Sequence, residues 1–241
     1  HNEDEIRRLG LKIGDTVILQ KAGDIIPDVV EVITKLRTGK EKKFVMPKKC
    51  PMCGGVVMKK KGEVALYCLN NSCFAKRLAG MTHFVSKAAF NIEGLGGKLI
   101  EKLMNAGLIK TADDIFSLTK GDLAPLEGLG EKSADNLISA IQDAKEIELS
   151  KFIFALGIRF IGSESSGLVA AQCKKLHNPK ELLSSISKLH VSDIEEIDGI
   201  GTKTGVSVIN WFNEKDNRLL LVQLNKEGVR FKKTKKVTSE K

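Results

Sequence analysis

Aromatic residues are scarce in this sequence: it has one Trp and one Tyr, and aromatic residues make up 5% of its 241 positions. Proteins that hold single-stranded nucleic acid by stacking need rings on the binding surface, so this composition argues against such a surface. The sequence also has no run of 18 or more apolar residues and no leader with charged, apolar and small-residue parts. We therefore expect no membrane span and no signal peptide, and a cytoplasmic, reducing compartment.

Positive charge is in excess. The formal net charge is +9, and the sequence pI is near 9.2. This balance suits a polyanionic partner, although a protein that is merely soluble can share it. Together with the scarcity of rings, the charge favours duplex DNA held by its backbone. At 42% hydrophobic residues the chain can form globular structure, but its motifs indicate several small domains in place of one core.

Four of the five cysteines follow a C-x2-C-x14-C-x4-C spacing. They are Cys50, Cys53, Cys68 and Cys73. Paired knuckles of this kind are typical of a structural zinc site, which we favour over disulfides. Gly54 and Gly55 permit a tight turn, and residues 56–58 and 64–67 predict a small hairpin between the knuckles. Four thiolates complete a tetrahedral zinc ion, so we expect the metal to hold structure and to perform no chemistry. Cys173 is expected in a buried core.

A five-residue motif with two glycines recurs between stretches of helical periodicity. Its copies are Ile92-Glu93-Gly94-Leu95-Gly96, Leu126-Glu127-Gly128-Leu129-Gly130 and Ile197-Asp198-Gly199-Ile200-Gly201, and a looser copy ends at Gly162. The second glycines fall at 96, 130, 162 and 201, a spacing typical of repeated supersecondary units. Positions four, seven and eight after each second glycine share one helical face, with small residues at position four in three copies. The pattern predicts four helix-hairpin-helix repeats.

Each of these turns leaves backbone N–H groups unpaired at the start of the second helix, with no side chain to block close approach. The helix dipole adds partial positive charge, so the turn suits an anion such as a nucleic-acid phosphate. One isolated Gly-x-Gly would favour an ordinary helical hairpin, whereas four in register favour a phosphate contact. Lysines two places after the second glycine could reach the same phosphate. The candidate residues are Gly94, Gly96, Lys98, Gly128, Gly130, Lys132, Gly199, Gly201 and Lys203.

The copy that ends at Gly162 departs from this pattern. It has Phe160 in place of the first glycine, and Glu164 where the other copies have lysine. It also carries Arg159, a cation that could reach phosphate. We include Arg159 and Gly162 among the candidate DNA contacts, but this copy has the fewest matching residues.

The two ends of the chain differ from the repeats. Residues 13–21 and 29–33 are strand-like, and with two or three strands they suggest part of a five-stranded OB-fold, so that the chain begins inside a domain. We predict a multi-domain, mainly α chain with an incomplete OB β-barrel. Its parts are a partial OB-fold at 1–45, a small four-cysteine zinc finger at 46–79, an all-α domain of four tandem helix-hairpin-helix repeats at 80–225 and a basic linker or tail at 226–241.

In this order of domains, the chain resembles the C-terminal half of a bacterial NAD-dependent DNA ligase. The segments 1–6, 14–17, 22–27 and 83–96 match that family's pattern closely. Lys21 stands where the family commonly has Arg, which keeps the charge but loses the planar fork of a bidentate contact.

The resemblance implies an enzyme that seals nicks in duplex DNA during replication and repair. NAD supplies an adenylate to the lysine of a Lys-x-Asp-Gly motif, which this chain does not contain. The fragment is therefore expected to be inactive alone. Zinc is the cofactor implied for this chain, whereas NAD and Mg are implied for the intact enzyme, bound mainly by an N-terminal part that the fragment lacks.

The resemblance also assigns contacts and partners. Lys21 would lie on a phosphate beside the nick, Ile25 and Ile26 would enter the minor groove, and the hairpins would take backbone phosphates without reading sequence. The implied partner is nicked double-stranded DNA. The chain is expected to be a monomer that works with its missing adenylation domain and with a C-terminal BRCT domain.

Two other classes of function compete with this interpretation. A non-catalytic, stand-alone helix-hairpin-helix protein that binds DNA structures would share the repeats, but the fixed order of residues 22–27 and the zinc finger argues against it. A zinc-ribbon RNA-binding protein is the other alternative, which a preference for single-stranded RNA over nicked duplex would support.

Overall fold

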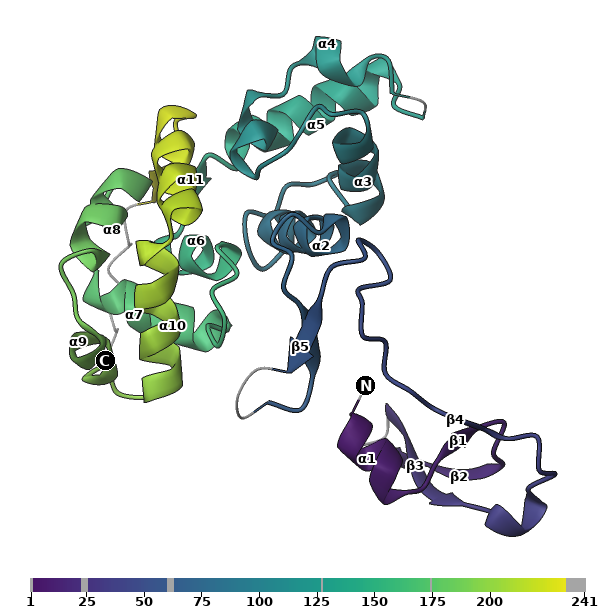
Figure 1. Ribbon diagram of the computed structural model, residues 1–241. Coiled ribbons are helices and arrows are strands. Elements are labelled where there is room, and N and C mark those ends of the chain that lie inside the picture. Colours follow the sequence, from purple (N-terminus) through teal and green to yellow (C-terminus); the bar gives the residue numbers. More distant parts are fainter. Residues whose placement is uncertain (1, 23–25, 60–62, 127, 174, 233–241) are drawn as a thin grey trace, which may run out of the picture. The chain divides into compact units, whose positions relative to one another are not determined.

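The computed structural model describes residues 2–22, 26–59, 63–126, 128–173 and 175–232 (Figure 1). The chain divides into two compact units, His1–Arg77 and Leu78–Lys241. None of the helices in the described ranges combines the length and apolarity that a membrane span requires.

Short strands dominate the first part of the N-terminal unit. Helix α1 (Glu3–Arg8) begins at Asn2, whose side chain accepts a hydrogen bond from the Asp4 N–H. Strand β1 (Lys12–Ile13) pairs with β4 (Lys42–Lys43), β2 (Val17–Ala22) pairs with β3 (Ile26–Val32), both antiparallel, and the 3-10 turn η1 (Thr34–Leu36) follows β3. Within the described ranges these strands form two separate two-stranded sheets, so the β-barrel is partial, as predicted.

An ion pair joins Asp15, between β1 and β2, to Arg37, which follows η1. The Arg37 guanidinium donates to both Asp15 carboxylate oxygens, at 2.7 and 2.8 Å, and to the Gly10 carbonyl at 2.8 Å. The Asp15 side chain is 1% exposed and also accepts from the Lys12 N–H. These contacts, led by Arg37, lower the pKa of Asp15 to about 2, so the carboxylate is charged over the whole physiological range.

The cysteine-containing segment folds as the sequence predicts. Strands β5 (Val57–Lys59) and β6 (Leu66–Cys68) form an antiparallel hairpin with Val57 opposite Cys68. Residues 60–62, between the two strands of this hairpin, lie outside the described ranges. Helix α2 (Phe74–Val85) begins directly after Cys73 and runs across residue 79, the end predicted for the zinc finger.

The second unit is built of helices and two short strands. Its elements are α3 (Gly97–Asn105), η2 (Asp113–Ser117), α4 (Lys120–Leu123), α5 (Glu131–Asp143), β7 (Glu146–Ile147), α6 (Leu149–Ala155), α7 (Ser163–Gln172), α8 (Pro179–Ile186), α9 (Val191–Glu195), α10 (Thr202–Asn213), α11 (Lys215–Lys226) and β8 (Arg230–Phe231). Helices α6 and α7 lie side by side, as do α9 and α10, and α8 and α11 (Figure 1). The mainly α prediction is confirmed.

The helical periodicity of the repeats correctly predicts which residues form their buried core. Positions four and seven after each second glycine are buried: Ile100, Leu103, Ala134, Leu137, Ser166, Val169, Gly205 and Val208. The buried Ser166 hydroxyl has a hydrogen-bond partner, because it donates to the Ser163 carbonyl at 2.8 Å. Cys173 is buried as expected, and burial raises the pKa of its thiol to about 11.

Strand β8 closes the helical unit after α11. It pairs with β7 in parallel, with hydrogen bonds from the Arg230 N–H to Lys145 and from the Lys232 N–H to Ile147. The Phe231 ring is buried, with its centroid 4.9 Å from that of Phe152. The helical unit therefore includes residues beyond 225, where the sequence predicted that the linker begins. Residues 233–241 of that linker lie outside the described ranges.

Candidate nucleic-acid interface and zinc site

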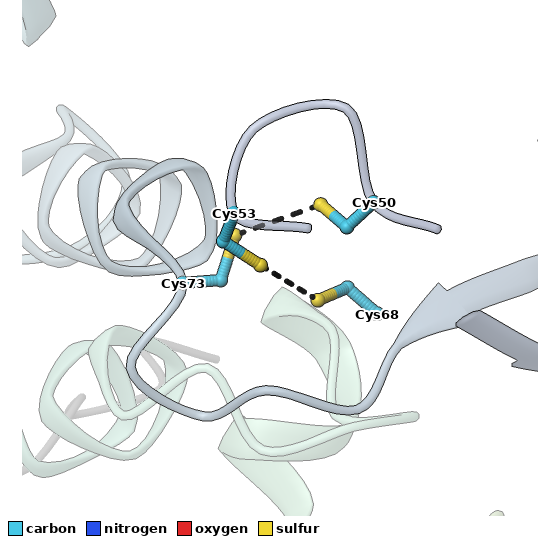
Figure 2. A group of neighbouring side chains, drawn as sticks. All are labelled: Cys50, Cys53, Cys68 and Cys73. Carbon is cyan, nitrogen blue, oxygen red and sulfur yellow. Dashed lines mark hydrogen bonds between the residues drawn. The ribbon is translucent and has the colours of Figure 1, made fainter. Parts of the chain in front are cut away.

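The four cysteines of the predicted zinc site come together at one point. Their Sγ atoms all lie within 4.8 Å of one another (Figure 2). Cys53 and Cys68 are 3.6 Å apart at sulfur, and Cys50 and Cys73 are 3.9 Å apart. Sulfurs about 2.3 Å from a tetrahedral zinc ion lie about 3.8 Å from each other, whereas a disulfide needs about 2 Å. All four are free cysteines, and their separation fits zinc.

Two glycines shape the first knuckle of this cluster. Gly54 has a φ of +68°, and its N–H donates to the Cys50 carbonyl. A Cβ added to Gly55 would lie 3.3 Å from the Cys53 sulfur and 3.1 Å from the Asn70 Cβ. A side chain at residue 55 would therefore require the Cys53 sulfur or Asn70 to shift by a few tenths of an ångström.

The surroundings of Cys53 favour the thiolate that a metal needs, whereas those of Cys68 do not. The Gly55 N–H and then the Asn70 side chain donate to the Cys53 sulfur and lower the pKa of this thiol to about 6. Burial raises the pKa of Cys68 to about 11, so the charge of a metal ion would be what holds this sulfur as a thiolate. Zinc held here by four thiolates would stabilise the fold.

The four repeats contain the same tight turn. In each, an N–H donates to the carbonyl three residues earlier, from Leu95 to Ile92, Leu129 to Leu126, Ile161 to Ile158 and Ile200 to Ile197, at 2.9 to 3.2 Å. The residue before each donor has a left-handed backbone, with φ of +81° at Gly94, +87° at Gly128, +66° at Phe160 and +85° at Gly199. A positive φ at the third residue of a turn is a feature of type II turns, and it explains the first glycine of the motif.

The second glycine of each motif begins a helix. Gly96, Gly130, Gly162 and Gly201 are the N-caps of α3, α5, α7 and α10, and as glycines they have no side chain to cap the first-turn N–H groups. A Cβ added to any of the four would meet no atom within 4 Å. A phosphate that approaches the first-turn N–H groups of these helices would therefore meet no side chain on the N-cap residue.

The first two hairpins pack against each other's helices, and the fourth packs against the helix of the third, which makes two pairs. A Cβ at Gly94 would lie 3.9 Å from Leu137 of α5, and one at Gly128 would lie 3.9 Å from the Lys102 Nζ of α3. In the second pair, a Cβ at Gly199 would lie 3.1 Å from Leu168 of α7. Sequence reasoning missed Lys102, because its approach to the second hairpin depends on this packing.

The other predicted contacts lie as follows. Lys98, Lys132 and Lys203 are exposed in the first turns of α3, α5 and α10. In the N-terminal unit, Lys21 is exposed on β2, and Ile26, at the start of β3, is 67% exposed. Ile25 lies outside the described residues.

The third hairpin differs from the other three in its side-chain contacts. The Arg159 guanidinium lies 4.7 Å from the centroid of the Phe160 ring, and the Gly162 N–H donates to the Ser165 hydroxyl at 2.9 Å. The sequence-based prediction did not include this serine, because the usual signal for such a contact is Glu or Gln three residues after the N-cap.

Comparison with protein families divides the chain into four matched regions. Residues 1–41 match the NAD-dependent DNA ligase OB-fold domain, and residues 49–75, which include all four cysteines, match the NAD-dependent DNA ligase C4 zinc finger domain. Residues 87–143 match a SAM-like helix-hairpin-helix tandem and residues 151–221 a helix-hairpin-helix motif. Each helix-hairpin-helix match contains two of the four hairpins.

Curated relatives align along nearly the whole chain. The DNA ligase of Bacillus subtilis (strain 168) is 43% identical over 242 aligned residues, which cover 100% of this chain and 35% of the relative. The DNA ligase of Halothermothrix orenii is 45% identical over 95% of this chain and 33% of the relative, and that of Thermoanaerobacter sp. (strain X514) is 42% identical over 98% and 35%. The chain thus spans about a third of the length of these relatives.

Two domains typical of NAD-dependent DNA ligases come first in the chain, and two helix-hairpin-helix regions follow them. The whole of this chain also aligns with part of a DNA ligase. One family accounts for all of these matches. The chain belongs to the NAD-dependent DNA ligase family and represents its OB-fold, zinc-finger and helix-hairpin-helix region.

Proposed function

We propose that this chain is the DNA-gripping part of an NAD-dependent DNA ligase, which seals nicks in duplex DNA during replication and repair. The observation that carries the proposal is the set of open helix N-termini at Gly96, Gly130 and Gly201, each followed by an exposed lysine. Backbone amides with a cation beside them are suited to phosphates and carry no information about base sequence.

The repeats would bind along the duplex through its phosphates. Lys102 would add a cation to the second hairpin, beside Gly128. In the N-terminal unit, Lys21 would take a phosphate, and the exposed Ile26 would contact the minor groove beside the nick. Holding the broken strand in register would contribute to the rate by positioning the reacting ends.

The chemistry of sealing would be supplied outside this chain. The sequence contains no Lys-x-Asp-Gly motif, so we expect the chain alone neither to adenylylate itself nor to join DNA ends. We propose that an N-terminal adenylation domain binds NAD and Mg, and that a BRCT domain follows the basic tail. We further propose a monomer in the cytoplasm, associated with the nucleoid when on DNA.

Equilibrium binding of the whole chain to labelled nucleic acids tests this proposal. We expect binding to nicked and intact duplex of any sequence. A plot of log K against log salt should have a negative slope, with about 0.9 contributed by each phosphate that the chain neutralises. A flat salt titration would contradict the phosphate-contact interpretation. Tighter binding to single-stranded RNA than to nicked duplex would support the RNA-binding alternative instead.

A further inference from the structure

The third hairpin differs from the others in the features that a phosphate contact uses. Phe160 replaces the first glycine, and Glu164 replaces the lysine of the first helical turn. The Gly162 N–H is already hydrogen-bonded to the Ser165 hydroxyl, at 2.9 Å. A phosphate that approached this turn would therefore meet a ring and a carboxylate in place of bare backbone and an ammonium group.

The backbone of Phe160 has an unfavourable conformation. Its φ of +66° lies in the left-handed region, which glycine accepts and which bulky residues rarely adopt. The residue is 50% exposed, so half of its surface is available for a contact outside the chain. Strain that the interior of a protein does not explain suggests that the residue serves a contact outside the chain.

The Phe160 side chain is paired with a cation. The Arg159 guanidinium lies 4.7 Å from the ring centroid. In the sequence, Arg159 occupies the motif position that is acidic in the other three copies, as Glu93, Glu127 and Asp198. The hairpin thus presents an apolar ring with a positive charge beside it. The wall of a DNA minor groove has matching chemistry, because its deoxyribose faces are apolar and its phosphates are negative.

We propose that Phe160 packs its ring against the sugars of the minor groove, while Arg159 takes the adjacent phosphate. In this arrangement, the third hairpin adds the apolar, salt-independent contact of Phe160 to the phosphate contact of Arg159, whereas the other three hairpins grip DNA through phosphates alone. The inference rests on the proposed function, since it assumes that the helical unit binds duplex DNA.

Salt-dependent duplex binding by single variants of the whole chain tests the inference. In Phe160→Gly we expect about fivefold weaker binding with an unchanged slope of log K against log salt, because only apolar contact is lost. The melting temperature should rise, because glycine accepts the left-handed backbone. Phe160→Tyr keeps the ring and should bind as the natural sequence does. Arg159→Gln should make the slope of log K against log salt shallower by about 0.9, because one fewer phosphate is neutralised.

Leu219 of α11 provides a matched control. It is an apolar residue with 53% exposure and lies outside the hairpins, so Leu219→Ala should leave duplex binding unchanged. The inference is overturned if Phe160→Gly binds duplex as tightly as the natural sequence, or if it melts at a lower temperature, which would assign the ring a packing role. Failure of the unaltered chain to bind duplex would instead contradict the proposed function.

Discussion

A side chain at residue 55 would enter the cysteine cluster. A Cβ there would lie 3.3 Å from the Cys53 sulfur and 3.1 Å from Asn70, which hydrogen-bonds the same sulfur. We predict that Gly55→Ala weakens zinc binding about tenfold, as changes next to metal ligands commonly do. Competition with a chromophoric chelator measures the affinity, and elemental analysis should first find one zinc per unaltered chain.

Gly54 is the control for this substitution. It has a φ of +68°, and a Cβ there would meet no atom within 4 Å. Asparagine tolerates the left-handed backbone, so Gly54→Asn should retain zinc affinity. Equal zinc affinity in Gly55→Ala and the unaltered chain would show that the cluster can move aside, contrary to its tight geometry.

The ion pair between Asp15 and Arg37 makes the N-terminal unit sensitive to acid. The pKa of Asp15 is lowered to about 2, from an ordinary value of about 3.9. A lowered pKa in the folded state stabilises the fold above the ordinary value, and this stabilisation is lost as pH falls towards 2. We predict that the protection of β1 and β2 amides against hydrogen exchange, taken relative to the intrinsic rate at each pH, falls between about pH 4 and pH 2, and that Arg37→Gln removes much of this pH dependence.

Arg8→Gln is the matched control for Arg37→Gln. Arg8 pairs with Glu5 within α1, but its side chain is 66% exposed, and exposed pairs contribute little to stability. Arg8→Gln should therefore leave exchange in β1 and β2 unchanged. The assignment to Asp15 fails if the two variants behave alike.

Residues whose roles depend on local pattern could be predicted from the sequence. The spacing of Cys50, Cys53, Cys68 and Cys73 was sufficient, and the structure brings their sulfurs together. Residues whose roles depend on long-range packing could not be predicted. Arg37 is 22 positions from Asp15, and Lys102 reaches Gly128 through the pairing of two repeats.

At the scale of elements, the two glycines of each hairpin have different roles. Gly199 has a φ of +85° and a possible Cβ 3.1 Å from Leu168, whereas Gly201 has an ordinary φ and open space around it. We predict that Gly199→Ala lowers the free energy of unfolding by about 2 kcal/mol. Gly201→Ala should cost less than about 1 kcal/mol. Chemical denaturation of the whole chain measures both, and equal costs would contradict this division of roles.

The second glycine should matter for DNA more than for folding. Gly130 has a φ of −75° and no atom within 4 Å of a possible Cβ, so Gly130→Val can fold and place a branched side chain in front of the helix N-terminus. We predict about tenfold weaker duplex binding, equal for different DNA sequences, through loss of hydrogen bonds to a charged phosphate. This single variant is cleaner than one that also replaces Gly128, whose φ is +87°.

Gly80 provides the control for Gly130→Val. It lies in α2, and a Cβ there would also meet nothing within 4 Å. Gly80→Val should bind duplex as the unaltered chain does. If a folded Gly130→Val does the same, the second hairpin does not hold a phosphate.

Periodicity predicts helices better than it predicts short strands. The repeats were foreseen because each helix shows its buried face in the sequence, as at Ile100 and Leu103. Strands β7 and β8 were missed because each has only two residues, and their pairing joins segments more than 80 residues apart. The conformation of Phe160 was also missed, since the sequence showed only that a glycine was absent.

At the scale of the whole molecule, the order of domains carries the functional argument. Helix-hairpin-helix pairs alone suit many DNA-binding proteins, and a cluster of four cysteines alone suits many zinc sites. The OB-fold and zinc-finger matches before the repeats restrict the family to NAD-dependent DNA ligases. The order of domains can be read directly along the sequence, so the sequence was sufficient to predict the family. The contacts proposed for Lys21 and Ile26 form only with bound DNA, so the sequence and the structure of the chain alone do not test them.

The most direct test of the account is NAD-dependent nick sealing by a chimaera. The matching third of the Bacillus subtilis DNA ligase, 43% identical, would be replaced by this chain. We predict that the chimaera seals nicked duplex with NAD, and that Gly130→Val slows sealing at low DNA concentration while self-adenylylation is unchanged. A folded chimaera that adenylylates itself but neither binds nor seals nicked duplex would contradict the claim that this chain grips the DNA.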